Sequence, residues 1–293
     1  MKVILSRKGA DGGNWKFPSP ILPDGRMLSF PIYSEKDSVC PNDLYLDGVD
    51  IKKLILDLHP NLSNDARIRH LHLDPDLNRN PNNRPKDWRP SLGQVNAAQG
   101  ILSNHKVNTN DVFLFFGWFK HVEEVKGKWK YCGKDIHSLF GWLEIENVLN
   151  FTDKNKENLI QQYHFLKQHP HYNSTNLSTN TVYISKDKSN YSKSSEFGAG
   201  VFRFSEKLQL TAEGRSKSQW LLPRWFKPDN LDYALSSHHN SKRWIEYTAS
   251  NDKVILQSVY RGQEFVMDSQ YFPELEDWIT EIIQEGTMEN LCM

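Results

Sequence analysis

The chain has 293 residues, of which 38% are hydrophobic and 25% charged, and its formal net charge is zero. This composition excludes a disordered chain, and the length suffices for one large domain or two small ones. Three widely spaced cysteines without a CxxC pair argue against a disulfide scaffold and a zinc knuckle. No apolar run approaches a membrane span, and residues 1–8 are too short an apolar segment for a signal peptide. We therefore expect a cytoplasmic protein without a membrane partner.

In chain order, the hydrophobic patterns first predict short strands at 3–5, 27–32 and 68–73, each ended by Gly, Pro or Asp. A helix is predicted at 92–105, and the apolar run 112–116 is typical of a central strand. The other predicted elements are strands near 128–131, 139–145, 200–204, 244–248, 254–258 and 263–267, a helix at 155–166, and a C-terminal helix that begins at Pro273 and carries an apolar stripe to Ile283.

These elements predict an α/β chain (mixed α+β) in which helices flank a central mixed sheet. The Asn-, Ser-, Thr- and Lys-rich tract 170–193 is the only serious linker candidate. It more readily forms a long insertion than a domain boundary. We therefore expect a single compact domain over 1–293 with a polar surface insertion around 168–195.

The first polar motif is SRKGADGG at residues 6–13, directly after the first strand. Small residues let a backbone approach a ligand closely, and Arg7 and Lys8 could meet phosphate. Asp11 would project from the turn at a strand's carboxyl end, where α/β proteins commonly place ligands. The alternative is an ordinary glycine-rich turn with a solvated Asp, and the motif matches neither a Walker loop nor GxGxxG.

The second motif is HLHLDPDL, in which His70, His72, Asp74 and Asp76 would share a face if the strand continued. Such a set could bind a divalent metal, or it could supply a base with its orienting partner. A His–Asp hydrogen bond at a turn is the simpler interpretation.

Two further motifs suit nucleic acid. Gln94 and Gln99 offer paired hydrogen bonds to a base edge, and Trp118, after Gly117, is a candidate pocket wall, whereas Phe113 and Phe115 are expected in the core. The loop GRSKS presents Arg215, Lys217 and Ser218 to phosphate, although it could be a basic surface turn.

At these motifs the chain resembles the third family of nucleotide-modification-associated domains. The matching segments run from residue 2 to about residue 226 and read VILSRKGADGG, PSPILPDGRMLSFPI, HLHLDPDL, SLGQVNAAQGIL with VNTNDVFLFFGWF, and GRSKSQWLLPRWF. The resemblance implies a setting of DNA base modification and conflict with phages, and it leaves the reaction open. It carries over the polar positions Arg7, Asp11, His72, Asp74, Asp76, Gln94, Gln99, Arg215, Ser218 and Trp220.

The leading hypothesis is a DNA glycosylase that extrudes a modified base and hydrolyses its N-glycosidic bond, in phage defence and without a cofactor or metal. Asp11 is the first choice for the catalytic carboxylate and Asp74, with His72, the second. The base would be held by Gln94, Gln99 and Trp118, and the DNA backbone by Arg7, Lys8, Arg215, Lys217 and Ser218. Alternatives are a base-modifying transferase, a metal-dependent nuclease using His72, Asp74 and Asp76, and a non-catalytic reader of modified DNA.

Overall fold

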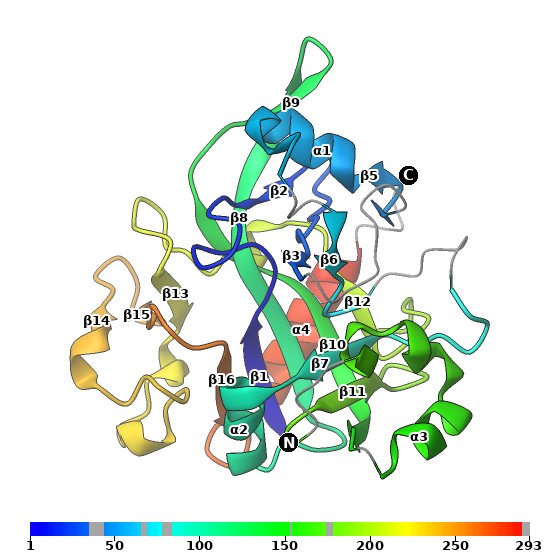
Figure 1. Cartoon of the computed structure of the whole chain (residues 1–293). Helices are drawn as coiled ribbons and strands as arrows, with labels where there is room; N and C mark the ends of the chain where they lie inside the picture. Colours follow the sequence, from blue (N-terminus) through cyan, green and yellow to red (C-terminus); the bar gives the residue numbers. More distant parts are fainter. Residues whose placement is uncertain (35–43, 66–68, 78–83, 153, 174–177, 289–293) are drawn as a thin grey trace.

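The computed structural model describes residues 1–34, 44–65, 69–77, 84–152, 154–173 and 178–288 (Figure 1). Within these residues the centre is a nine-stranded mixed sheet with the main strand order β16-β1-β8-β10-β11-β7. Strand β12 pairs with β10, and β2 and β9 pair with β8. The bounds are β1 (Lys2–Arg7), β2 (Ser19–Ile21), β7 (Ser91–Gln94), β8 (Val112–Val125), β9 (Lys128–Tyr131), β10 (Ile136–Asn150), β11 (Thr181–Ser185), β12 (Ala199–Val201) and β16 (Glu264–Asp268).

The sheet mixes parallel and antiparallel pairs. Strand β1 runs parallel to β8, with Val3 opposite Val112, and antiparallel to β16 on its other side. Strands β8 and β9 form a hairpin whose turn, Lys126-Gly127, has two positive φ angles of 53° and 77°. A primed turn of this kind needs a left-handed residue, and glycine adopts that conformation without steric cost.

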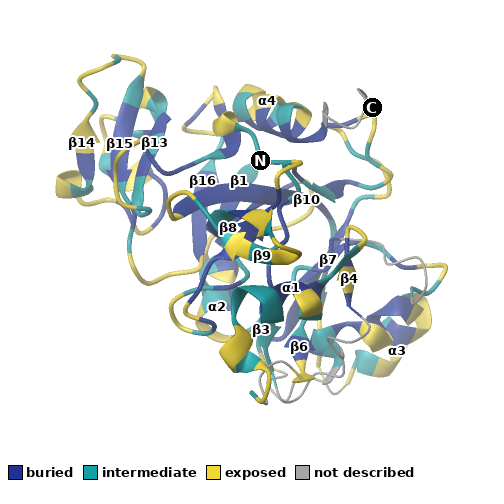
Figure 2. Cartoon of the chain, turned by 90° about the horizontal axis from the view of Figure 1, so that it is seen from above, coloured by how far each residue is buried: buried dark blue, intermediate teal, exposed yellow. Residues whose placement is uncertain are grey.

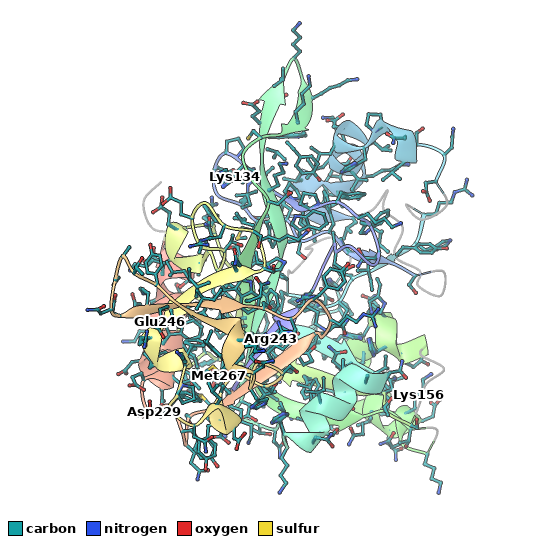
Figure 3. All side chains as sticks on the ribbon, turned by 90° about the vertical axis from the view of Figure 1, so that its left-hand side faces the viewer. Lys134, Lys156, Asp229, Arg243, Glu246 and Met267 are labelled. Carbon is teal, nitrogen blue, oxygen red and sulfur yellow. The ribbon has the colours of Figure 1, made fainter. Side chains whose placement is uncertain are left out.

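Three small sheets and several helices surround the central sheet. The small sheets are β13 (Gln219–Pro223) with β15 (Lys253–Gln257) and β14 (Trp244–Glu246), β3 (Ile32–Tyr33) with β6 (Leu71–His72), and β4 (Tyr45–Leu46) with β5 (Val49–Asp50). Figure 3 views the molecule from the side that carries β14, where Glu246 is exposed and pairs with Arg224 and Lys227. The α-helices are α1 (Ile51–Leu58), α2 (Asn96–Asn104), α3 (Lys156–Gln162) and α4 (Leu275–Met288).

Seven short 3₁₀ helices complete the elements of the described residues. They are η2 (Pro60–Leu62), η4 (His164–Gln168), η5 (Pro170–Asn173), η6 (Glu206–Leu208), η7 (Arg224–Phe226), η8 (Leu231–Tyr233) and η9 (Ser241–Arg243).

Alternation along β1 and β8 divides the core between the two faces of the sheet. Val3, Leu5 and Phe116 pack with α4 and with the β13–β15–β14 sheet, whereas Ile4 and Phe115 pack toward α2. Figure 2 shows α4 on one side of the dark, buried strands and α1 and α2 on the other. The sequence prediction of a mixed α+β fold with helices flanking a central sheet is confirmed.

Several element predictions need correction. Residues 91–94 form strand β7 rather than the start of a helix, which begins only at Asn96. The strand expected at 68–73 is limited to β6 among the described residues, and that expected at 27–32 is limited to β3. The expected surface insertion around 168–195 contains β11, which is buried throughout between β10 and β7. Among the described residues, no helix is both long and apolar enough to cross a membrane.

Candidate functional site

The end of β1 separates two groups of polar side chains. Successive residues of an extended chain point to opposite faces of a sheet, so Arg7 follows Leu5 to one face and Lys8 follows Ser6 to the other. We call these the Arg7 face and the Lys8 face. The structure therefore separates two neighbouring cations, for both of which the sequence predicts a contact with the DNA backbone.

The Arg7 face carries a cavity of about 580 Å³. A volume of this order accommodates a small-molecule ligand or a nucleotide unit. Four residues that the sequence predicts for the site line this cavity, and they come from three distant segments of the chain: Arg7 and Asp11, Trp118, and Lys217. The complete lining is Arg7, Ala10, Asp11, Gly12, Gly13, Lys16, Trp118, His137, Lys217, Tyr260, Arg261, Gly262 and Gln263.

The Arg7 guanidinium is fixed at the wall of this cavity. It donates hydrogen bonds to the carbonyl oxygens of Tyr260 at 2.8 Å and Val259 at 3.0 Å, and it lies 5.5 Å from the centre of the Phe116 ring. Burial lowers the pKa of Arg7, and the negative charge of Asp11 acts in the opposite direction. An arginine remains ionised despite such a shift, so the cavity keeps a fixed positive charge near Asp11.

Asp11 is held by an Asx turn of its own loop. Its Oδ1 accepts hydrogen bonds from the backbone N–H groups of Gly13 at 2.7 Å and Asn14 at 2.9 Å, and the Asn14 Oδ1 accepts the Asp11 N–H at 2.9 Å. Asx turns of this kind are a local use of Asp and Asn side chains. The turn orients the Asp11 carboxylate at the cavity, and the hydrogen bonds from the Gly13 and Asn14 N–H groups both go to Oδ1.

Trp118 and Lys217 form another part of the cavity wall. The Lys217 Nζ lies 3.2 Å from the centre of the Trp118 ring, a cation–π contact. Burial lowers the pKa of Lys217, with a further contribution from the charge of Arg7. Tyr260, which is 85% exposed, adds a second aromatic side chain at the same cavity.

His137 lines the cavity, and no sequence motif indicates it because it stands within an apolar strand. Its Nδ1 accepts the indole N–H of Trp220 at 3.0 Å, so the neutral ring carries its proton on Nε2. Burial, followed by the charges of Arg7 and Lys217, lowers the pKa of His137 to about 3. A neutral imidazole with an N–H donor is therefore available at the cavity.

Acid should destabilise the fold through His137 and His238, because burial lowers their pKa values to about 3 and about 4. The unfolded rings titrate near pH 6.5, so the unfolded state binds more protons below that pH. The contribution of these two rings to the free energy of unfolding is therefore fully present above about pH 6.5. It decreases as the pH falls below that value, by up to about 1.4 kcal/mol per pH unit for each ring. Urea unfolding between about pH 7.5 and pH 5 measures this slope.

The variant His238→Gln should flatten that pH dependence. The exposed neighbour His239 provides the matched control, since His239→Gln should leave the slope unchanged. Equal slopes in the wild type and in His238→Gln would show that this ring does not contribute.

On the Lys8 face, the centre is a buried carboxylate, Glu264. It accepts hydrogen bonds from the Ser6 hydroxyl at 3.0 Å and from the Gln94 amide, and its Oε1 lies 3.5 Å from the Lys8 Nζ. Burial raises the pKa of Glu264, and the positive charge of Lys8 opposes that shift. Gln94 is thus engaged in the interior rather than in the cavity of the Arg7 face.

Next to Glu264, three imidazoles surround the Asp74 carboxylate. The His72 and His171 Nε2 atoms lie 3.8 and 3.7 Å from Asp74 Oδ2, and the His169 Nε2 lies 3.9 Å from Oδ1. Burial raises the pKa of Asp74, but the neighbouring imidazoles of His72 and His171 and the charge of Lys8 outweigh it and hold that pKa below its usual range. We call His72, Asp74, His169 and His171 the histidine–aspartate cluster.

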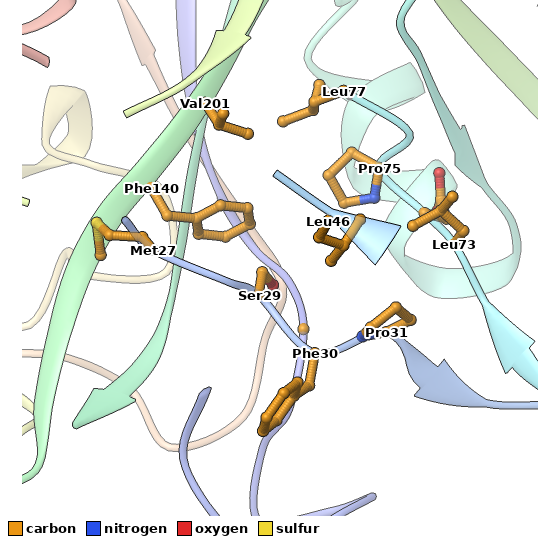
Figure 4. A pocket seen from close by; sticks show the side chains of 12 residues that line it. Met27, Ser29, Phe30, Pro31, Leu46, Leu73, Pro75, Leu77, Phe140 and Val201 are labelled. Atoms are coloured by element: carbon orange, nitrogen blue, oxygen red, sulfur yellow. The ribbon is translucent and has the colours of Figure 1, made fainter. Parts of the chain in front are cut away.

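The space beside Asp74 is small. A cavity of about 30 Å³ borders Asp74 and Ser29 and is otherwise mainly apolar, with Phe30, Phe140 and Leu77 among its walls (Figure 4). It has room for about one or two water molecules and not for a base. Of the two faces, the Arg7 face is the one whose cavity fits a base.

The remaining predicted site residues lie elsewhere. Asp76 does not share a face with His72, because strand β6 ends at His72. Its carboxylate instead pairs with Arg84 and accepts the Trp88 indole N–H. Gln99 is buried and bonds to the Tyr183 hydroxyl and to Ser103. Arg215 is exposed and Ser218 accepts a hydrogen bond from Gln257, and neither lines the cavity.

One comparison with known proteins is informative. The family model described as nucleotide modification associated domain 3 matches residues 2–268. The chain belongs to this family. The match covers both faces described above, from β1 to the end of β16. Neither a curated protein nor a solved structure matches the chain.

Proposed function

We propose that this member of the family hydrolyses the N-glycosidic bond of a modified base in DNA, with the extruded base in the cavity of the Arg7 face. The observation that supports this most strongly is that Asp11, Trp118, Arg7 and Lys217 border one cavity of about 580 Å³. A carboxylate, a stacking surface and cations for phosphate are the groups that the reaction requires. Release of modified bases would act against foreign DNA that carries them.

The base would stack on Trp118, and Tyr260 would contact a neighbouring nucleotide. Lys217 covers the Trp118 ring in the structure, so the base can stack only when Lys217 moves to a flanking phosphate. The flexible stem of lysine allows this movement, and a phosphate attracts the ammonium group more strongly than an aromatic ring does. Arg7, fixed by two carbonyl groups, would stay in place as a second positive charge.

Asp11 would act on water and on the sugar. As the bond between C1′ and the base nitrogen breaks, the base takes the electron pair, and positive charge develops on the sugar, where a carboxylate stabilises it. Water adds to C1′ and gives a proton to Asp11, and the released base gains a proton in turn. The His137 Nε2–H would hydrogen-bond the departing base as a neutral donor.

The test is to incubate the purified chain with DNA that contains ordinary, methylated, hydroxymethylated or glucosylated cytosine, with and without EDTA. Mass spectrometry identifies the products, and alkali cleaves abasic sites. Release of a free base with or without EDTA is the expected result. An increase in the mass of the DNA would indicate the transferase instead, unchanged DNA in every sample would indicate a reader, and strand breaks that EDTA prevents would indicate a nuclease.

Replacing Lys217 by Ala should weaken binding to DNA of any sequence and reduce the slope of log affinity against log salt by about 1. The reason is that one phosphate contact, and the counterion released with it, would be lost. Fluorescence anisotropy over a range of salt concentrations measures both quantities. Lys207 is a suitable control because it is an exposed lysine that pairs with Glu281 and Glu285, so Lys207→Ala should preserve the slope. An unchanged slope in Lys217→Ala would remove Lys217 from the DNA site.

A further inference from the structure

The histidine–aspartate cluster joins two segments that are distant in sequence. His72 ends β6 and Asp74 follows it, whereas His171 belongs to η5. The ligand atoms of His72, Asp74 and His171 all lie within 4.8 Å of one another. Because Asp74 and His171 are largely buried, with side chains 6% and 7% exposed, their polar atoms need partners inside the protein.

The hydrogen bonds of His171 leave a lone pair on its Nε2 that is directed at the Asp74 carboxylate. The Asn180 amide donates to the His171 carbonyl oxygen at 2.8 Å, which fixes the amide orientation, and its Oδ1 is 2.8 Å from the His171 Nδ1. Nδ1 therefore carries the ring proton, and the unprotonated Nε2 faces Asp74 Oδ2 at 3.7 Å. Two acceptors that face each other at this distance are stabilised when a cation lies between them.

His169 orients the carboxylate from the other side. Its Nδ1 accepts the His171 backbone N–H at 3.2 Å, so the neutral ring carries its proton on Nε2. This Nε2 is buried, finds no hydrogen-bond acceptor among the described residues, and lies 3.9 Å from Asp74 Oδ1. The same Oδ1 accepts the Gly93 N–H at 2.7 Å. The Gly93 N–H thus holds Oδ1 with the His169 ring beside it, which leaves Oδ2 toward His72 and His171, as outer partners do around metal ligands.

We propose that His72, Asp74 and His171 bind a divalent transition metal ion of the zinc type. Imidazole nitrogens and a carboxylate oxygen suit this class, and zinc binds them at about 2.0–2.2 Å, which places tetrahedral ligand atoms about 3.3–3.5 Å apart. The distances of 3.7 and 3.8 Å found here need only small movements. The positive charge of Lys8 nearby is balanced by Glu264.

The proposed site differs from the one that the sequence suggested, because Asp76 is replaced by His171. Three protein ligands leave a tetrahedral ion one position for water or another oxygen ligand. The site lies on the Lys8 face, opposite the cavity to which we assign the base. It is independent of the proposed glycosidic reaction, which remains measurable in EDTA.

The test is to remove metal from the full chain with a chelator and titrate it with zinc in competition with a chromophoric chelator. One zinc ion per chain is expected, together with a rise in melting temperature and an X-ray absorption spectrum that shows nitrogen and oxygen ligands without sulfur. His72→Ala and His171→Gln should each weaken zinc binding by about 100-fold or more. The exposed residue His239 provides a control, since His239→Ala should bind zinc like the wild type.

Circular dichroism would establish that each variant is folded, and His72, whose side chain is 19% exposed, is the ligand least disturbed by truncation. Two results would overturn the proposal. One is a wild-type chain that takes up less than about a tenth of an equivalent of zinc. The other is equal zinc affinity in the wild type, in His72→Ala and in His171→Gln.

Discussion

Replacing Asp11 by Asn is expected to reduce base release by about 10²–10⁴-fold without a loss of folding stability. The amide oxygen of Asn can accept the same N–H bonds from Gly13 and Asn14, so the Asx turn should persist. The negative charge that would activate water and stabilise the sugar is lost. Single-turnover release of the base, measured by mass spectrometry, gives the rate, and urea unfolding gives the stability.

Asp252 is the matched control for this substitution. It is an exposed Asp that interacts with Ser250 in the loop before β15 and does not line the cavity. Asp252→Asn should release base at the wild-type rate. A folded Asp11→Asn protein that is as active as the wild type would exclude Asp11 as the catalytic carboxylate, and Asp74→Asn would then be the next variant to examine.

Replacing Gly93 by Ala is expected to destabilise the chain by about 1–3 kcal/mol. A Cβ atom at this position would lie 2.1 to 2.5 Å from three atoms of the His171 ring. The ring cannot move away without breaking its hydrogen bond to Asn180 and leaving the histidine–aspartate cluster. The free energy of unfolding in urea measures the effect, and zinc affinity should fall in the same variant.

At Gly100 the same substitution is expected to change the stability in the opposite direction. It lies within α2, and no atom stands within 4 Å of a Cβ added there. Because glycine is a poor helix former, Gly100→Ala should stabilise the chain by up to about 1 kcal/mol. If both alanine variants changed stability in the same direction and by the same amount, the close approach of Gly93 to His171 would not control the local structure.

The fold could be predicted from the sequence where a segment has one clear hydrophobic pattern that indicates either a strand or a helix. The apolar run in β8 and the apolar stripe of α4 are long and periodic, and both elements appear as expected. Strands β7 and β11 could not be predicted, because each is short and lies in a polar or ambiguous segment. Their strand conformation depends on long-range pairing, of β7 with β11 and of β11 with β10.

The residues of the candidate site likewise include some that the sequence predicts and some that it does not. Arg7, Asp11, Trp118 and Lys217 were recognised by their residue type and turn context, and they meet at one cavity. The alternation of β1 could have separated Lys8 from Arg7, but the strand end was not predicted closely enough to use it. His137, His169 and His171 were missed because histidine is as common in a core or a loop as in a site, and only tertiary contacts bring His171 to Asp74.

The central claim is that a base of DNA enters the cavity of the Arg7 face. Photo-crosslinking with DNA that carries 5-iodocytosine tests it directly, since the excited base couples to an aromatic side chain in contact with it. Peptide mass spectrometry should locate the cross-link at Trp118 or Tyr260, and Lys217→Ala should reduce its yield. Cross-links found only on the Lys8 face, or only in peptides outside the cavity lining, would contradict the account.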